Sequence, residues 1–296
     1  MTDNTKSIAL AGTAVLSWAT VATAFKIALG QLTVYNMLLV ATVTATLIYA
    51  VMMSIEGRWK GLAGMPGKLM LEAMALGLLN PTVYYLVLFQ AYDMLPAQVA
   101  QPVNYAWPIF LLVLLAVFNH EKIPARKYIG MAISVGGVVC ISMGGGGVEG
   151  SLSVGGILMA ALSAALWAIY WMVNDRLKGR LDTTTSLFLG FATGSVMLVA
   201  GGLVSGAIDV RSTEGLLSGI YIGCFEMGIP FLTFGMALRI TKNPALVNQM
   251  CYLSPFLSLF LIGMVLGEKI APATYAGLAL IVAGLVYNQY FVKEKA

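Results

Sequence analysis

Ten long apolar runs, separated by short polar segments, dominate the pattern of this chain. Each run approaches the roughly 20 residues that an α-helix needs to cross a bilayer core about 30 Å thick. The connections between the runs are too short to hold a soluble domain. The pattern therefore predicts an all-α membrane protein with ten transmembrane helices. The runs cover residues 8–29, 33–54, 69–92, 97–118, 125–145, 153–173, 185–206, 214–238, 246–266 and 271–292.

One stretch of this pattern occurs twice. Residues 105–139 and 252–286 carry the same residue type at 13 of 35 positions without a gap, and Glu121-Lys122-Ile123 against Glu268-Lys269-Ile270 is the sharpest part of the match. Such self-similarity indicates a duplication. Each copy contains five spans, an odd number, so the second copy must enter the bilayer upside down. We expect two inverted five-helix repeats, residues 1–147 and 148–296, around a central cavity.

Composition agrees with a membrane protein, and the charges orient it. Charged residues make up 10% of the chain and hydrophobic residues 59%, against roughly 25% and 45–50% in soluble domains. With the N-terminus inside the cell, fourteen Lys and Arg residues fall on the side of the two termini, and only Arg211 and Lys269 fall on the other side. Cytoplasmic loops carry such an excess. We therefore expect both termini to be cytoplasmic.

The residue types argue against an enzyme. A membrane-embedded enzyme needs a nucleophile with a base, or a set of metal ligands. The single histidine, His120, lies at the end of a run, there is no Asp/Glu cluster, and the three cysteines do not have metal-ligand spacing. The Gly144 to Gly147 run lacks the Gly-Lys-Ser/Thr of a phosphate-binding loop. We expect no catalytic residue, no metal, no cofactor and no ATP hydrolysis by this chain.

Polar side chains recur inside the fourth and ninth runs, where contact with lipid would leave them unsatisfied. The repeat places Gln101 on Asn248 and Tyr105 on Tyr252. Two equivalent helices thus present an amide and a phenol at equivalent depths. These groups either face a ligand site or form hydrogen bonds between helices.

Paired interruptions occur in the two halves. Asn80-Pro81 breaks the third run, and Gly228-Ile229-Pro230 breaks the eighth. Proline frees a main-chain carbonyl and kinks a helix. Paired breaks of this kind point to a binding site in membrane proteins that are built from inverted repeats. Ordinary kinks are the alternative interpretation.

Large aromatic side chains lie near the middle of several runs. They are Trp18 and its repeat mate Trp167, Trp107 in the fourth run, Tyr84 and Tyr85 in the third, and Tyr170 and Trp171, which follow Trp167. Trp and Tyr normally gather at the membrane interfaces, but rings in mid-membrane can stack on a flat or apolar ligand or hold a cation on a ring face. Each ring alone is explained as well by packing. As a set on repeat-related helices, they favour a cavity.

Two charged residues lie inside runs. Glu226 is the only acidic residue deep inside one, and the repeat places it next to Asn80. A carboxylate there must be paired, protonated or in contact with water. Glu226 is a candidate for holding an ammonium group, for titrating as a proton site or for pairing with a cation. Lys26 lies within four residues of the end of its run, so we expect a structural role with its ammonium near the surface.

Together these features resemble the drug/metabolite transporter superfamily, EamA type. The resemblance covers nearly the whole chain, and its most specific motifs are Pro108 to Ile123 and Pro255 to Ile270. The aromatic runs and the broken third run look most similar to the YddG-type aromatic amino-acid exporters of the bacterial inner membrane. The resemblance implies a central cavity enclosed by the first, third, fourth, sixth, eighth and ninth spans.

With this resemblance, we expect a secondary transporter that exports amino acids, among them Phe, Tyr and Trp, by alternating access. The alternative is a transporter for another substrate class: a threonine-like neutral amino acid, a purine metabolite or an organic cation. The expected partners are the lipid bilayer and a small-molecule substrate, with no nucleic acid, and the protein is a monomer or a weak homodimer. The expected substrate-binding residues are Trp18, Asn80, Tyr84, Gln101, Tyr105, Trp107, Trp167, Glu226, Asn248 and Tyr252.

Overall fold

Helices make up all the regular structure in the part of the chain that can be described. A computed structural model describes residues 3–118, 124–144, 152–177, 179–241 and 244–290. In these ranges nine helical stretches are long and apolar enough to cross a membrane, and the last element is a tenth long helix of 19 residues. The expected all-helical membrane fold is confirmed. The elements are α1 (Asp3–Leu29), α2 (Val34–Ile55), α3 (Trp59–Ala63), α4 (Gly67–Gly77), η1 (Leu78–Val83), α5 (Tyr84–Met94), α6 (Ala97–Asn104), α7 (Trp107–Phe118), α8 (Lys127–Gly144), α9 (Val154–Asn174), η2 (Asp175–Leu177), α10 (Thr183–Ser205), α11 (Thr213–Ile222), η3 (Gly223–Gly228), α12 (Ile229–Ile240), α13 (Pro244–Met250), α14 (Leu253–Leu261), η4 (Ile262–Leu266) and α15 (Pro272–Tyr290).

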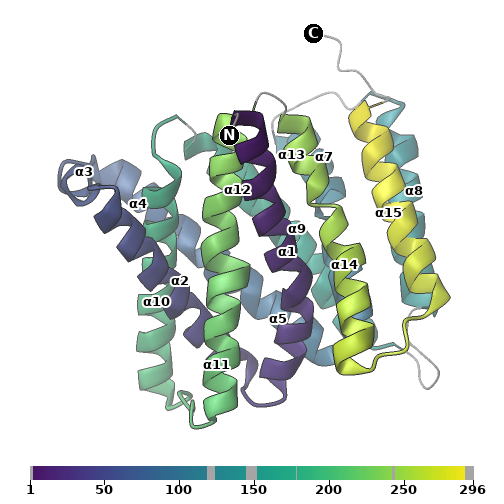
Figure 1. Cartoon of the computed structure of the whole chain (residues 1–296), viewed down its shortest axis with the longest axis horizontal. Helices are drawn as coiled ribbons and strands as arrows, with labels where there is room; N and C mark the ends of the chain where they lie inside the picture. The colour runs from purple at the N-terminus through teal and green to yellow at the C-terminus, as the bar shows by residue number, and fades with distance from the viewer. Residues whose placement is uncertain (1–2, 119–123, 145–151, 178, 242–243, 291–296) are drawn as a thin grey trace.

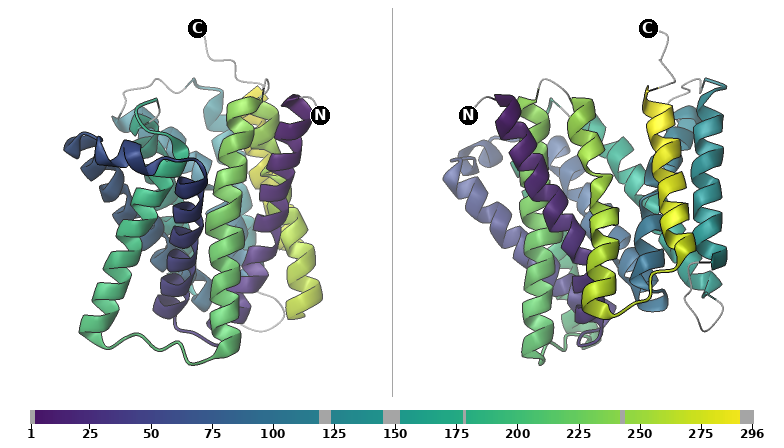
Figure 2. Two further views of the ribbon diagram at one scale, coloured as in Figure 1. Left: turned by 60° about the vertical axis from the view of Figure 1, so that its left-hand side comes forward. Right: turned by 45° about the vertical axis from the view of Figure 1, so that its right-hand side comes forward.

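The long helices run up and down through the molecule (Figure 1). The N-terminal end of α1 and the C-terminal end of α15 lie at the same end of the bundle (Figure 2). We call this end the basic end and the opposite end the far end. The far end carries Arg211 before α11 and Lys269 before α15. The described basic residues of the basic end are Lys6, Arg58, Lys60, Lys68, Arg126, Lys127, Arg176, Arg180 and Arg239.

Short polar residues begin several of the helices. Thr33, Ser153, Asp182 and Ser212 each accept a hydrogen bond from the main-chain N–H three residues later, at the N-termini of α2, α9, α10 and α11. Such caps satisfy donors that the first turn of a helix leaves free. At the other end of α10, Gly206 has a φ of 67°, in the left-handed region that glycine adopts without steric cost. Local sequence signals thus set where these spans begin and end.

The fifth and tenth spans, α8 and α15, lie side by side along their length (Figure 2). Their glycines permit this approach: Gly130 faces the backbone of Gly284, and Gly137 faces that of Gly277. At the repeat offset, Gly130 corresponds to Gly277 and Gly137 to Gly284. A rotation that swaps the two halves therefore turns each contact into the other, as a two-fold axis requires. Gly136 does not share in this contact, because no neighbouring atom lies within 4 Å of where its Cβ would be.

The other spans also pack across the two halves in repeat-related pairs. α2 lies against η3 and α11, and its counterpart α10 lies against η1 and α4. α1 lies against α12 and α14, and its counterpart α9 lies against α5 and α7. The second span of each half thus covers the third span of the other. This packing agrees with the inverted repeat that the sequence indicates.

The repeated Glu-Lys-Ile step is described in its second copy. The first copy, with His120 beside it, and the expected boundary between residues 147 and 148 lie outside the described residues. In the second copy, the carboxylate of Glu268 accepts hydrogen bonds from the main-chain N–H groups of Ala97 at 3.1 Å and Gln98 at 3.3 Å. A carboxylate at a helix N-terminus satisfies free donors and faces the positive end of the helix dipole. Glu268 therefore ties the second half to α6 of the first half at the far end.

Candidate functional site

The third span of each half is broken near its middle, as the sequence predicts. The π-helical segments η1 and η3 occupy the breaks, where Asn80 has φ −137° and ψ 118° and Gly228 has φ −82° and ψ −82°. The Thr82 hydroxyl donates to the main-chain oxygen of Gly77 at 2.8 Å. In a regular helix the Gly77 carbonyl would accept from the main-chain N–H of residue 81, which proline lacks. The Thr82 hydroxyl supplies the missing donor. The breaks thus bring irregular backbone into the centre of the bundle.

Gly190 and Gly194 of α10 lie against the first of these breaks. The backbone of Gly190 approaches that of Gly77 so closely that a Cβ on Gly77 would clash, and a Cβ on Gly194 would meet Pro81. Close approach of backbones is the usual role of paired glycines in membrane helices. Gly190 and Gly194 therefore make a close contact between two spans of the same chain.

The fourth and ninth spans are broken as well, at places that the repeat makes equivalent. α6 ends one residue before Tyr105, and α14 begins one residue after Tyr252. The Tyr105 hydroxyl donates to Ser254 Oγ at 3.0 Å, which joins the two halves at these breaks. The sequence pattern did not predict the breaks, although Pro108 and Pro255, three residues after each tyrosine, are a signal for them.

Glu226 lies on η3, in the break of the eighth span. Its Oε1 accepts a hydrogen bond from the Tyr85 hydroxyl of α5 at 3.0 Å, and its main-chain oxygen accepts one from Trp18 Nε1 of α1 at 3.2 Å. Glu226 is 9% exposed, and Tyr85 is fully buried. Three elements that are distant in the sequence therefore meet at this carboxyl group. Tyr85 was visible as a mid-span aromatic residue, but no periodicity indicates its partner.

Aromatic rings continue from this carboxyl group through the centre of the bundle. Trp18 packs against Phe231 and Phe234 of α12, with ring centroids 6.2 and 5.5 Å apart. Phe231 lies 5.8 Å from Trp167, and Trp167 lies 4.7 Å from Tyr84. The structure therefore brings three of the predicted rings together. Phe231, which links them, was missed because nothing in its sequence context distinguishes it from a packing residue.

Trp107 lies at the edge of this ring group. It stacks on Trp171 with a centroid distance of 6.4 Å and an interplanar angle of 19°. Trp171 in turn meets Trp167 edge-on at 6.0 Å. The two tryptophans of α9 are four residues apart, the spacing that puts side chains on one face of a helix. Trp107 is thus connected to the central rings through α9.

The amide side chains differ in their surroundings. Gln101 is 3% exposed, and none of the described residues gives its Oε1 a hydrogen bond. Its repeat mate Asn248 is exposed, so equivalent positions in the repeat do not mean equivalent environments. Asn104 donates to Ser163 Oγ at 2.9 Å and accepts a long hydrogen bond of 3.5 Å from the Tyr84 hydroxyl. Asn104 is therefore engaged in helix packing. The Oε1 atom of Gln101 remains free to accept a hydrogen bond from a ligand.

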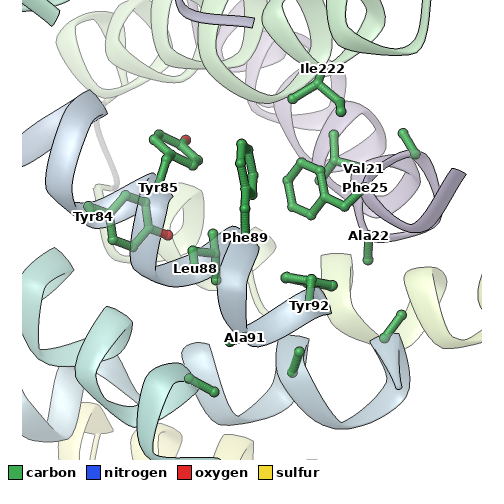
Figure 3. Close-up of a cluster of buried hydrophobic side chains, with 14 of the residues drawn as sticks. Val21, Ala22, Phe25, Tyr84, Tyr85, Leu88, Phe89, Ala91, Tyr92 and Ile222 are labelled. Carbon is green, nitrogen blue, oxygen red and sulfur yellow. The ribbon is translucent and has the colours of Figure 1, made fainter. Parts of the chain in front are cut away.

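Buried side chains of α1, α5 and α11 form one cluster, which includes Tyr85 (Figure 3). Phe25 of α1 packs against Phe89 and Tyr92 of α5, with ring centroids 4.8 and 5.0 Å apart. Phe89 also lies 5.3 Å from Tyr85, the hydrogen-bond donor of Glu226. The carboxyl group is thus separated from the far end by a packed core.

Lys26 has the structural role that the sequence led us to expect. Its Nζ donates to the main-chain oxygens of Tyr92 at 2.8 Å and Leu95 at 3.2 Å, at the C-terminal end of α5. The last carbonyls of a helix lack helical donors and attract cations. Lys26 therefore ties α1 to α5, about two turns beyond Trp18 along its helix.

Comparison with known proteins places this fold among characterised families. The model of the EamA-like transporter family matches residues 5–143 and, a second time, residues 154–288. The "Uncharacterized transporter YvbV" of Bacillus subtilis is 27% identical over 210 residues, which cover 70% of this chain and 68% of that protein. The "Aromatic amino acid exporter YddG" of Ancylobacter novellus is 25% identical over 205 residues, which cover 68% of this chain and 70% of that protein.

A further relative and a solved structure agree with this placement. The "Probable terminal-alkyne amino-acid exporter" of Streptantibioticus cattleyicolor is 25% identical over 182 residues, which cover 60% of this chain and 59% of that protein. One crystal structure matches over 97% of both chains with a TM-score of 0.67 at 20% identity, which shows the same fold. Because the family model matches the two halves in turn and these relatives are transporters rather than enzymes, this chain belongs to the EamA-like transporter family.

Proposed function

We propose that this transporter exports amino acids, among them Phe, Tyr and Trp and related metabolites, by alternating access. One observation carries the proposal: Glu226, the buried carboxyl group at the broken centre of the bundle, lies beside Trp18 and its group of aromatic rings. A carboxylate binds an ammonium group, and rings stack on an aromatic side chain or face a cation. The two relatives whose names describe amino-acid exporters support this substrate class.

The predicted site residues divide into apolar walls and orienting groups, the usual arrangement in small-molecule sites. Glu226 would hold the substrate ammonium. The amide N–H groups of Gln101 and Asn80, both buried, would donate to the substrate carboxylate. Asn248 is the fourth orienting group. The rings assigned to the walls are those of Trp18, Tyr84, Tyr105, Trp107, Trp167 and Tyr252.

The distribution of basic residues sets the proposed direction of transport. Cytoplasmic loops of membrane proteins carry the excess of Lys and Arg, so the basic end would face the cytoplasm of a bacterial cell and both termini would lie there. Substrate would then enter from the basic end and leave at the far end, across the inner membrane. Since Gly190 and Gly194 are used for contacts inside the chain, we propose a monomer as the working unit.

An organic cation is the second candidate for the substrate. The described residues place no Lys, Arg or His against Glu226. The carboxylate of a zwitterionic amino acid would therefore have only amide groups as hydrogen-bond donors. An organic amine without a carboxylate needs no such donors. A threonine-like amino acid would use the ring group less. A purine would stack on the rings but brings no ammonium group for Glu226.

Transport into proteoliposomes tests the proposal. The panel contains radiolabelled tryptophan, threonine, adenine and tryptamine, which is tryptophan without its carboxylate. Saturable uptake of tryptophan that unlabelled phenylalanine and tyrosine compete away supports an aromatic amino-acid exporter. Uptake of tryptamine alone would favour the organic cation, and absent or non-saturating flux for every amino acid would contradict the proposal.

A further inference from the structure

Glu226 differs from the other acidic residues of the chain. It is the only buried acidic side chain in the described ranges. Glu72, by contrast, is partly exposed and pairs with Arg180 at 2.8 Å. A carboxylate inside a membrane protein is costly unless a proton, a cation or water neutralises it. The source of that neutralisation decides what Glu226 does during transport.

The titratable side chains around Glu226 are phenols and a thiol. Tyr85 of α5 donates to Oε1, the only carboxylate oxygen that a hydrogen bond from the described residues reaches. From α2, Tyr49 donates to the main-chain oxygen of the next residue, Met227. From α11, Tyr221 donates to Thr20 at 2.7 Å. The titratable set on the neighbouring elements is Tyr35, Tyr49, Tyr84, Tyr85, Tyr92, Tyr105, Tyr221 and Cys224.

The charged groups on the same elements lie farther away. Each is about two or more helical turns from the part of its element that meets Glu226. Lys26 is already bonded to carbonyls of α5. These charged groups are Asp3, Lys6 and Lys26 on α1, Glu56 at the end of α2, Asp93 on α5, Glu214 on α11 and Arg239 on α12. None of the described residues therefore supplies a cation for this carboxylate, and a proton or a ligand has to neutralise it.

A proton and an ammonium group can each neutralise the carboxylate, and they exclude one another there. Tyr85 fixes Oε1, so the second oxygen remains for an incoming donor. The Trp18 indole lies next to the same residue, with its N–H bonded to the main-chain oxygen of Glu226. Building on the export function proposed here, we propose that Glu226 binds a proton and the substrate ammonium alternately, which makes the protein a proton/substrate exchanger.

The exchange balances in atoms and charge. At the basic end, the carboxylic acid releases its proton to the cytoplasm and the carboxylate binds the ammonium of a substrate. At the far end, the ammonium leaves with the substrate and the carboxylate takes a proton from that side. One proton moves inward for each substrate that moves outward. For a zwitterionic amino acid the cycle carries one net positive charge inward, so both a pH gradient and an inside-negative potential drive it.

The test uses the purified full chain in proteoliposomes with radiolabelled tryptophan. With an inward-directed proton gradient, or with an inside-negative potassium diffusion potential, we expect wild-type protein to expel tryptophan against its concentration gradient. A pH-sensitive dye inside the vesicles should report one proton entering for each tryptophan that leaves. Saturable tryptophan flux that depends on neither the proton gradient nor the membrane potential would overturn the coupling but would still support the export function. If no amino acid moves, the export function itself fails.

Two variants locate the coupling at Glu226. Glu226→Gln keeps the shape but cannot exchange a proton, so tryptophan should only equilibrate, with the gradient-driven ratio falling to about 1. Glu72→Gln, which removes the exposed carboxylate that pairs with Arg180, should keep the wild-type ratio. Thermal unfolding of each variant checks folding, and gradient-driven expulsion by folded Glu226→Gln would overturn the assignment.

Tyr85→Phe tests the positioning role of the phenol. This variant keeps the carboxyl group but removes its hydrogen-bond donor. Proton exchange should persist, and the pH at which transport is half-maximal should move away from the wild-type value. A purely structural Tyr85 would change the thermal stability and leave that pH unchanged, and this result would remove Tyr85 from the proposal.

Discussion

The two ends of the bundle consist of repeat-related elements but are packed differently. At the far end, the C-terminal half of α1 lies against α5, and the rings of Phe25, Phe89 and Tyr92 are buried together (Figure 3). At the basic end, the counterparts are the C-terminal half of α9 and α12. Their ring contact, between Trp167 and Phe231, lies near the middle of the two spans.

The residue types explain this difference. At the offset that relates Trp18 to Trp167, Phe25 corresponds to Asn174 and Lys26 to Asp175. An aromatic ring and a helix-capping cation at the far end are thus replaced by an amide and a carboxylate at the basic end, where Asn174 is partly exposed and Asp175 is exposed. The structure therefore shows the far end closed by a core of packed, buried rings. An alternating-access cycle requires the basic end to close in its turn, with contacts of a more polar kind.

The largest expected effect is on the access of reagents to the two ends. In a chain with Cys140, Cys224 and Cys251 replaced by alanine, Ala28→Cys should resist a water-soluble maleimide, because Ala28 is fully buried at the far end. Asn174→Cys at the basic end should be modified readily. Mass spectrometry of timed samples measures both rates. Equal rates would mean that the two ends are equally closed.

The next effect is on stability. Phe89→Ala removes a fully buried ring from the far-end core and should lower the free energy of unfolding by about 3–5 kcal/mol. Phe260→Ala removes a ring of α14 that is 68% exposed and should change it by no more than about 0.5 kcal/mol. Unfolding followed by circular dichroism in detergent compares the two. Similar losses would contradict a special role for the far-end core.

Lys26→Met should weaken the far end more modestly. The variant loses two charge-assisted hydrogen bonds to α5, a contribution of about 1.5–3 kcal/mol for a charged donor. It should also speed the maleimide reaction of Ala28→Cys, because α1 is no longer tied to α5. Lys60→Met, at an exposed position on α3, is the control. An unchanged reaction rate would show that Lys26 does not hold this end closed.

The smallest expected effect concerns the central rings. Trp18→Ala should raise the half-saturating concentration of tryptophan roughly 2- to 10-fold, as expected for one lost ring contact, and that of threonine less. Trp107→Ala should act in the same direction. Trp59→Ala, a ring on α3 at the basic end, should leave both values unchanged. Equal losses for tryptophan and threonine would refute stacking at Trp18.

Much of the fold could be predicted because it depends on local and repeated signals. The span pattern, the inversion and the breaks at Asn80 and Gly228 all follow from composition, proline chemistry and a repeat with an odd number of spans. The structural role of Lys26 also follows from its place near the end of a span. These features need no knowledge of which helices touch.

The centre of the candidate site could be predicted only in part. Tyr85 and Glu226 are 141 residues apart, and their contact depends on how two broken spans cross, which no periodicity encodes. Asn248 shows a second limit. The repeat relates it to Gln101, but one amide is exposed and the other buried, because the two halves are packed differently within one conformation.

The glycine contacts between α8 and α15 have a consequence for how the chain assembles. Gly130 with Gly284 and Gly137 with Gly277 form an isologous interface, the kind by which two identical subunits pair about a two-fold axis. Separate five-helix subunits would form it only above a concentration set by their dissociation constant. Covalent linkage supplies both partners in equal number at any expression level, and it allows each partner to acquire its own residues.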